Sequence, residues 1–270
     1  MKRTYLSLLI AGALVLAFNP SVEAKGNTQS SAPATLTVGA TPVPHAELLN
    51  LIKDDMAAQG ITLKVVEFTD YVQPNMALIS GDLDANFFQH VPYLESNPEW
   101  AAKIVSAFGV HVEPFGLYST KYKSINDLPN GASIAIPNDP SNCGRSLLLL
   151  QSKGLLTLKS GVGLTATPRD IADNPKNFKF QELEAAQLPR SLSDVDAATI
   201  NGNYALEAGF NPQKDSLIIE GADSPYVNII AVLKGKENDP RILALKKALL
   251  SQKVKDYINA HYDGGVAAVF

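Results

Sequence analysis

Short apolar runs alternate with polar loops and helix-like segments along most of this chain. Residues 65–95 show the pattern clearly: an apolar run, a polar loop, a short helical segment that stops at residues 80–81, and a second apolar run at 83–88. Near the C-terminus, residues 239–251 and 254–261 have the periodicity of amphipathic helices. Strands that alternate with helices are typical of α/β layers with parallel strands. The pattern therefore predicts an α/β fold.

Part of this pattern occurs twice. The tetrapeptide at residues 82–85 (DLDA) recurs as DVDA at residues 194–197, and the Leu-Glu pair at 94–95 recurs at 206–207. Both repeats are separated by 112 positions (194 − 82 and 206 − 94). Because the order of the predicted elements is kept around both copies, we predict two lobes of similar architecture that face each other.

Two long extended runs lie where the chain would pass between these lobes. Residues 105–120 would leave the first lobe, and residues 226–233 would return to it. We therefore expect two strand crossings and, in each lobe, a mixed, mostly parallel sheet flanked by helices. The expected limits are residues 36–115 with 230–270 for the first lobe and residues 116–229 for the second.

The N-terminus has the features of an export signal. Residues 1–3 (MKR) are basic, an apolar run follows, and residues 22–24 (VEA) fit a small-x-small cleavage site. We expect a signal peptide over residues 1–24, cleaved near Ala24, and a flexible lead over residues 25–35. The apolar run is shorter than the roughly 20 residues of a spanning helix. Since no cysteine lies near the cleavage site, we expect a soluble periplasmic protein.

Composition and motifs exclude several classes of protein. The chain has 270 residues, of which 23 are basic and 27 acidic, and no cluster of Lys and Arg predicts nucleic-acid binding. Its only cysteine is Cys143, so no internal disulfide can form. The sequence has no phosphate loop, dinucleotide fingerprint, G-x-S-x-G motif or paired catalytic carboxylates. The four histidines have no metal-ligand spacing, so we predict neither a metal nor a cofactor.

Aromatic side chains gather at two predicted strand ends. These are Tyr71, Phe88, His90 and Tyr93. Ligands of α/β proteins bind outside the carboxyl ends of the strands, so four rings in these positions favour a pocket wall. The alternative is that they fill the core.

Arg145 begins a predicted helix after a loop rich in Pro and Asn. A guanidinium beside a helix N-terminus suits a carboxylate or phosphate; the alternative is a surface salt bridge. Amide side chains that could hold an α-ammonium and an α-carboxylate lie at further strand and loop ends. They are Asn142, Asn201, Asn203 and Asn228. Cys143 could be a nucleophile activated by the helix N-terminus and Arg145, or a small filler residue.

Several long segments resemble the methionine-binding proteins of the MetQ/NlpA lipoprotein family, the substrate-binding components of bacterial ABC importers. The resemblance extends from about Leu36 to Phe270. The segments are LTVGATPVP (36–44), EFTDYVQPN (67–75), DANFFQHVPYL (84–94), IPNDPSNCGR (136–145), EAAQLPRSL (184–192), NGNYALEA (201–208) and SPYVNIIA (224–231).

The resemblance implies a two-lobed periplasmic-binding-protein fold, type II-like, that closes on L-methionine. It implies an apolar cage for the thioether from Tyr71, Phe88, His90 and Tyr93. It also implies Arg145 as the carboxylate ligand, with Asn142, Asn203 and Asn228 holding the α-amino and carboxylate groups. The implied partner is a membrane ABC permease/ATPase complex, and we expect a monomer without catalytic activity.

Two features depart from the family pattern. The family is typically lipid-anchored, but this chain has no cysteine at the predicted cleavage site. Cys143 lies between two expected ligand residues, which leaves D-methionine, a methionine dipeptide or another apolar amino acid as alternative ligands. An exported thiol enzyme that uses Cys143 with His90 or Arg145, and a surface adhesin, are the alternatives from other classes.

Overall fold

The computed structural model describes Met1, residues 34–221 and residues 224–270. The predicted signal peptide, apart from Met1, and the predicted cleavage site lie outside the described residues. So does the lead up to residue 33. Its last two residues, Ala34 and Thr35, were expected to be flexible and instead begin the first strand.

Six strands form the first sheet, in the order β13-β4-β12-β3-β1-β2. β1 pairs in parallel with β2 and β3, with Ala34 beside Ile61 and Ala40 beside Glu67 in the β1–β2 register. β12 runs antiparallel to both β3 and β4. The strands are β1 (Ala34–Ala40), β2 (Ile61–Glu67), β3 (Ala85–His90), β4 (Ile104–Val112), β12 (Val227–Leu233) and β13 (Ala267–Ala268).

Five strands form the second sheet, in the order β11-β5-β10-β6-β9. β6 is parallel to β9 and β10, whereas β5 is antiparallel to β10 and β11. Mixed sheets are thus confirmed, but among the described strands only the pairs within β1–β3 and around β6 are parallel. The strands are β5 (Gly116–Tyr118), β6 (Ser133–Pro137), β9 (Lys179–Leu183), β10 (Ala197–Ile200) and β11 (Ile218–Ile219); β7 (Thr157–Leu158) and β8 (Ile171–Asp173) form a separate hairpin.

The chain crosses between the sheets twice. It leaves the first sheet after β4 and enters the second at β5, so the run expected over residues 105–120 is two strands separated by residues 113–115. It returns at β12, which belongs to the first sheet along its whole length, whereas the expected lobe limit divides this strand at residue 229. The assignment of residues to lobes stays a prediction.

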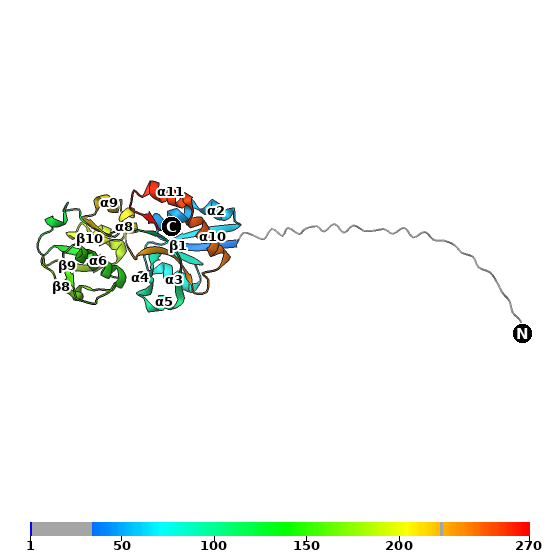
Figure 1. The fold of residues 1–270 in the computed structure, drawn as a ribbon, viewed down its shortest axis with the longest axis horizontal. Helices are drawn as coiled ribbons and strands as arrows, with labels where there is room; N and C mark the ends of the chain where they lie inside the picture. Colours follow the sequence, from blue (N-terminus) through cyan, green and yellow to red (C-terminus); the bar gives the residue numbers. More distant parts are fainter. Residues whose placement is uncertain (2–33, 222–223) are drawn as a thin grey trace. The chain divides into compact units, whose positions relative to one another are not determined.

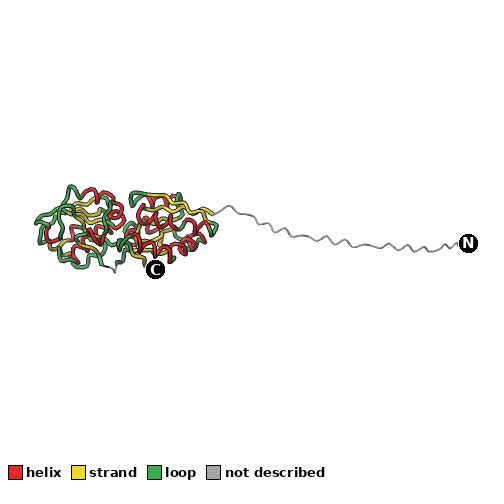
Figure 2. The backbone as a smooth tube through the Cα atoms, turned by 90° about the horizontal axis from the view of Figure 1, so that it is seen from above, coloured by secondary structure: helices red, strands yellow, loops and turns green. Residues whose placement is uncertain are grey.

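Helices surround each sheet (Figures 1 and 2). With the first sheet are η1 (Pro42–Ala46), α1 (Glu47–Leu51), α2 (Lys53–Ala57), α3 (Gln73–Ser80), α4 (Val91–Glu95), α5 (Pro98–Lys103), α10 (Pro240–Leu249) and α11 (Gln252–His261). With the second are η2 (Ile125–Asp127), α6 (Pro140–Ser152), η3 (Pro168–Asp170), η4 (Ala185–Gln187), α7 (Leu188–Ser191), α8 (Gly202–Glu207) and α9 (Pro212–Asp215). None of the helices in the described ranges has the length and apolar character needed to cross a membrane.

Three segments differ from expectation. Apolar residues at helical spacing predict one helix over residues 46–59, but it is interrupted at Ile52, which has φ −100° and ψ 6° between α1 and α2. The sequence also predicts a helical turn over residues 168–174, which ends at Asp170 and continues as β8. The helix α5 is not predicted from the sequence. The predicted stop of α3 is confirmed, because Gly81 follows it in the left-handed conformation with φ 87°.

The central strands of each sheet, such as β3, β12, β6 and β10, are buried on both faces, which explains their nearly continuous apolar sequences. Alternate residues of β3 enter different cores: Phe87 packs with α1, α2, α10 and α11, and Phe88 packs with α3, α4 and α5. In the second sheet, Ile134 and Ala135 of β6 are separated in the same way. The sheets are therefore rigid supports for the loops at their ends.

Candidate functional site

All eight residues predicted to bind a ligand line one cavity between the two sheets. Phe88, His90 and Tyr93 come from β3 and the start of α4, and Tyr71 comes from the loop after β2. The other four come from α6 (Asn142 and Arg145), α8 (Asn203) and β12 (Asn228). The cavity has four further lining residues: Gln89, Glu113, Asn201 and Gly202.

One wall of the cavity is aromatic. The ring centroid of Tyr71 lies 5.8 Å from that of Phe88 and 5.7 Å from that of Tyr93, and Phe88 and Tyr93 are 6.0 Å apart. These spacings are typical of favourable tilted and edge-to-face packing. Tyr204, on α8 beside the second sheet, packs against Tyr71 with the ring centroids 4.9 Å apart but does not line the cavity. Phe88 and Tyr93 also belong to a core cluster, so wall and core are continuous here.

His90 links the two sheets as a neutral hydrogen-bond donor. Its Nδ1 accepts the backbone N–H of Tyr93 at 3.1 Å, so the ring proton is on Nε2, which donates to Asn142 Oδ1 at 3.2 Å. Burial and the nearby charge of Arg145 lower the pKa of His90 to about 3. The imidazole therefore stays uncharged at neutral pH.

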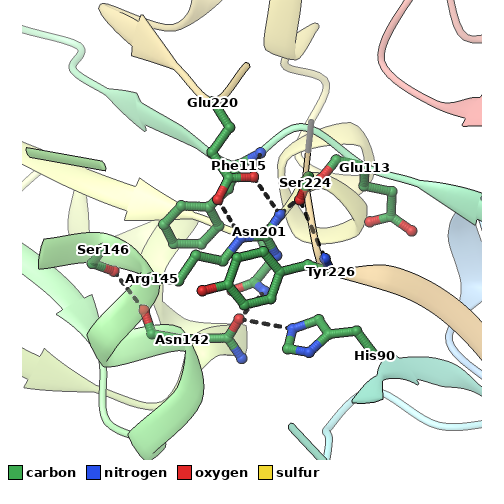
Figure 3. Close-up of polar contacts among 10 residues, drawn as sticks. All are labelled: His90, Glu113, Phe115, Asn142, Arg145, Ser146, Asn201, Glu220, Ser224 and Tyr226. Carbon is green, nitrogen blue, oxygen red and sulfur yellow. Dashed lines mark hydrogen bonds and ion pairs between the residues drawn. The ribbon is translucent and has the colours of Figure 1, made fainter. Parts of the chain in front are cut away.

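Arg145 is buried, which excludes the surface salt bridge considered from the sequence. Its guanidinium lies 4.8 Å from the ring centroid of Phe115 and 4.1 Å from that of Tyr226 (Figure 3). Nε and Nη2 bind the two carboxylate oxygens of Glu220 at 2.7 and 2.6 Å, and Nη2 also donates to the Glu113 backbone carbonyl at 3.1 Å. Nη1 has no hydrogen-bond partner among the described residues, and Arg145 lines the cavity.

The asparagine side chains that line the cavity differ in how many of their amide atoms already have hydrogen-bond partners. Asn142 Oδ1 accepts from both His90 and Asn201, and its Nδ2 donates to Asp139, so Asn142 positions its neighbours. Asn203 Oδ1 accepts from the Tyr71 hydroxyl at 2.5 Å. Asn203 Nδ2 and Asn201 Oδ1 are buried without a partner in the described part of the chain. The cavity thus presents a free donor and a free acceptor.

A second polar cluster behind the cavity was not predicted. Glu113 Oε1 lies 2.8 Å from His111 Nε2 and 3.3 Å from His45 Nε2, and the latter is also 3.1 Å from Asn228 Oδ1. All three members of the cluster are buried. The spacing of the histidines in the sequence does not predict that His45 and His111 are neighbours. The sequence offers only a local indication: His111 and Glu113 are two residues apart at the end of an apolar strand, and His45 follows the first strand.

Burial determines the charges of this cluster. It lowers the pKa of His45 to about 4 and that of His111 to about 3, so both rings are neutral at pH 7. Burial also raises the pKa of Glu113, while the neighbouring His45, the backbone N–H of Asn203 and the charge of Arg145 act in the opposite direction. The acceptors around His45 Nε2 require a proton there, so Thr41 Oγ1 donates to His45 Nδ1 at 2.8 Å.

Cys143 belongs to the core of the second lobe rather than to the cavity. Its side chain is buried among apolar residues, and burial raises the pKa of its thiol to about 12. A thiolate is the reactive form of cysteine. The environment of Cys143 therefore opposes a nucleophilic role and favours the filler interpretation.

Comparison with known proteins agrees with this geometry. The sequence model of the family described as NlpA lipoprotein matches residues 36–270. The chain is 42% identical to the methionine-binding lipoprotein MetQ of Bacillus subtilis, over 97% of this chain and 98% of that one. It is 46% identical to the D-methionine-binding lipoprotein MetQ of Salmonella typhimurium, over 76% and 77%.

A solved structure is similarly close. A nutrient binding protein from Burkholderia cenocepacia, bound to methionine, matches with a TM-score of 0.84 and 50% identity, over 87% of this chain and all of that one. The two-lobed fold is thus confirmed. The relatives' designation as lipoproteins runs against the expectation of a freely soluble protein.

Proposed function

This chain belongs to the NlpA lipoprotein family, and from that membership we propose that it captures L-methionine between its two lobes for an ABC importer. The observation that carries the proposal is the composition of one cavity. An aromatic wall and a polar end with both donors and acceptors face the same space. Methionine has the matching parts: a soft thioether chain at one end and a zwitterion at the other.

The aromatic wall suits the thioether. The ring centroids of Tyr71, Phe88 and Tyr93 lie 5.7–6.0 Å apart, so the wall offers both ring faces and ring edges. Sulfur contacts with aromatic rings are favourable by about 0.3–1.5 kcal/mol each. The uncharged His90 completes this wall without introducing a charge beside the thioether.

Arg145 and Asn203 suit the carboxylate. Asn203 Nδ2 is a buried donor without a partner among the described residues, and the hydrogen bonds of Arg145 use Nε and Nη2 but not Nη1. Both residues line the cavity, where a charge-assisted hydrogen bond is strong. Asn142 and Asn228 position other side chains at this end of the cavity. Asn142 Oδ1 accepts hydrogen bonds from His90 and Asn201, and Asn228 Oδ1 accepts one from His45.

Lobe closure accounts for ligand capture. Hydrogen bonds from Tyr71 to Asn203, from His90 to Asn142 and from Tyr204 to the Thr69 carbonyl join the loops of the two sheets. A ligand that contacts both sets of loops favours the closed form. We propose that the closed, loaded monomer then docks on a membrane permease/ATPase complex. The proposal includes no enzymatic step.

Native mass spectrometry of the purified protein tests the proposal. The complex should carry one ligand, and unfolding followed by chiral chromatography should release L-methionine. Release of D-methionine would support the alternative that the Salmonella typhimurium relative's name suggests. An empty protein that gives no calorimetric signal with either enantiomer would overturn the proposed function.

A further inference from the structure

We propose that Glu220 limits the affinity of the cavity for a ligand carboxylate, because it shares Arg145 with the ligand and offsets part of the guanidinium charge. The inference rests on the proposed function and concerns delivery, since a protein that hands its ligand to an importer must also release it. Glu220 itself does not line the cavity, so its effect is exerted through Arg145. Glu220 is thus an affinity-setting residue and not a ligand-binding one.

The N–H groups of Arg145 are divided between the protein and the cavity. A guanidinium has five N–H donors, and its strongest carboxylate contacts use two nitrogens along one edge. Nε and Nη2 bind the two oxygens of Glu220 at 2.7 and 2.6 Å, and the second Nη2 hydrogen goes to the Glu113 carbonyl at 3.1 Å. Because each two-nitrogen edge includes Nη2, a ligand carboxylate is left with Nη1 alone.

Glu220 is fixed beside Arg145 by the first chain crossing (Figure 3). Its backbone N–H donates to the Phe115 carbonyl at 2.9 Å, and the Phe115 N–H donates to Glu220 Oε2 at 3.3 Å. The side chain of Glu220 is 15% exposed and that of Arg145 is 4% exposed, so water and salt screen this pair weakly. A carboxylate anchored in this way stays beside Arg145 when a second carboxylate approaches.

The orientation of Arg145 does not depend on Glu220 alone. The guanidinium lies 4.8 Å from the ring centroid of Phe115 and 4.1 Å from that of Tyr226, and Nη2 is bonded to the Glu113 carbonyl. These partners hold the guanidinium in place and leave its full positive charge available. What Glu220 adds to them is a negative charge.

The negative charge of Glu220 opposes that of Arg145 at a neighbouring side chain. Burial raises the pKa of the Tyr226 hydroxyl to about 12, and the charge of Arg145 lowers this pKa while the charge of Glu220 raises it. Among the described residues, Glu220 is the only side chain that forms an ion pair with Arg145. A ligand carboxylate at Nη1 is therefore attracted by Arg145 and repelled by Glu220.

Limited affinity suits a protein that must release its ligand. Affinity differences between related complexes arise mostly in the dissociation rate, so a weaker carboxylate contact shortens the lifetime of the loaded state. The alternative is that Glu220 only stabilises the fold as a buried ion pair. That alternative predicts weaker or unchanged methionine binding when the charge of Glu220 is removed, whereas our inference predicts tighter binding.

Calorimetry of Glu220→Gln tests the direction of this change. Gln has the size of Glu and keeps one oxygen that can accept from Arg145, but it lacks the negative charge. After unfolding and refolding to remove ligand, Glu220→Gln should bind L-methionine at least about 10-fold more tightly than wild type, because a like charge has been removed from a site with an effective dielectric constant of about 20. Dissociation in stopped flow should slow by a similar factor. Unchanged or weaker binding by natively folded Glu220→Gln would overturn the inference.

Two comparisons show whether the charge is the cause. L-Methioninol, in which an alcohol replaces the carboxylate, should bind wild type and Glu220→Gln equally well. Glu220→Asp keeps the charge and should show no tightening of L-methionine. Equal tightening of both ligands in Glu220→Gln, or tightening in Glu220→Asp, would overturn the inference. Glu182→Gln, the same change at an exposed position of the second sheet, is the matched control.

A double variant tests the same charge if Glu220→Gln does not fold. Arg145→Ala leaves the Glu220 carboxylate unpaired, so it repels the ligand carboxylate without compensation. Arg145→Ala/Glu220→Gln should therefore bind L-methionine at least about 10-fold more tightly than Arg145→Ala. Equal affinity of these two variants would overturn the inference. Wild-type protein that bound no methionine would instead refute the proposed function itself.

Discussion

At the scale of single residues, the cavity depends on side chains whose other contacts are already fixed. Asn142 is held by Asp139, and Arg145 by Glu220 and two aromatic rings. Because these contacts already restrict the rotamers of the side chains, ligand binding costs less side-chain conformational entropy. We therefore expect substitutions here to affect ligand affinity more strongly than similar substitutions on the surface.

Replacement of Arg145 tests the carboxylate end. Arg145→Ala should raise the Kd for L-methionine by at least about 100-fold in calorimetry, since both the guanidinium charge and the Nη1 donor are lost. The melting temperature should also fall, because Glu220 loses its partner. Arg190→Ala, which removes an exposed arginine, is the control. Unchanged methionine affinity in Arg145→Ala would contradict the assignment.

Tyr71 distinguishes a pocket wall from a core filler. Tyr71 is only partly buried and packs against rings from both sheets. Tyr71→Ala should weaken methionine about 10-fold or more, with a smaller loss of unfolding free energy than a fully buried Phe→Ala change, which costs about 3–5 kcal/mol. Denaturant unfolding without ligand provides the comparison. A loss of stability in that range, with little change in methionine affinity, would show that Tyr71 fills the core and does not form a pocket wall.

The sequence allowed prediction of cavity residues that follow a predicted strand or begin a predicted helix. Phe88, His90 and Tyr93 could be predicted because parallel strands end at a common edge. Glu113 and His45 could not, since they meet only where a crossing segment and the first loop converge. Glu220 was also missed, because its pairing with Arg145 joins positions 75 residues apart and leaves no local pattern.

At the scale of elements, local sequence signals explain why the end of α3 could be predicted and why α5 was not. From the sequence alone, Asn97-Pro98 predicts the end of a helix that starts near Pro92. In the structure Asn97 is instead the N-cap of α5, accepting the backbone N–H groups of Glu99 and Trp100, and Pro98 is the first helical residue. Asn followed by Pro is a start signal as much as a stop signal. The buried Trp100 on α5 could have decided between them.

The cap of α5 can be tested directly. Asn97→Ala should lower the free energy of unfolding by about 1 kcal/mol, the usual effect of removing an N-cap. Asn97→Asp, which keeps an accepting oxygen, should cost less. Urea unfolding measures both, and methionine affinity should stay unchanged because α5 does not line the cavity. Equal stability of the wild-type protein and Asn97→Ala would contradict the capping role.

At the scale of the whole molecule, three buried neutral histidines couple folding to pH. The pKa values of His45, His90 and His111 are lowered to about 4, 3 and 3, whereas an unfolded histidine has a pKa of about 6.5. Below pH 6.5 the unfolded chain therefore binds protons that the native protein does not. Stability falls as the pH decreases from 6.5 towards 4, by up to about 1.4 kcal/mol per pH unit for each histidine. The raised pKa of Glu113 partly offsets this loss.

Urea unfolding of the ligand-free protein at pH 7, 6 and 5 tests this coupling. Unfolding free energy should decrease most steeply between pH 6 and 5, and the slope should be smaller in His111→Gln, which removes one of the three groups. His261→Gln, at an exposed histidine, is the matched control. A stability that stays constant from pH 7 to 5 would show that the buried rings do not resist protonation.

The most direct test of the account is a calorimetric titration of refolded, ligand-free protein with L-methionine. We predict saturable binding of one methionine per chain, abolished in Arg145→Ala and retained in Arg190→Ala. Absence of binding to either enantiomer of methionine, in protein whose circular dichroism is native, would contradict the claim that this cavity captures methionine.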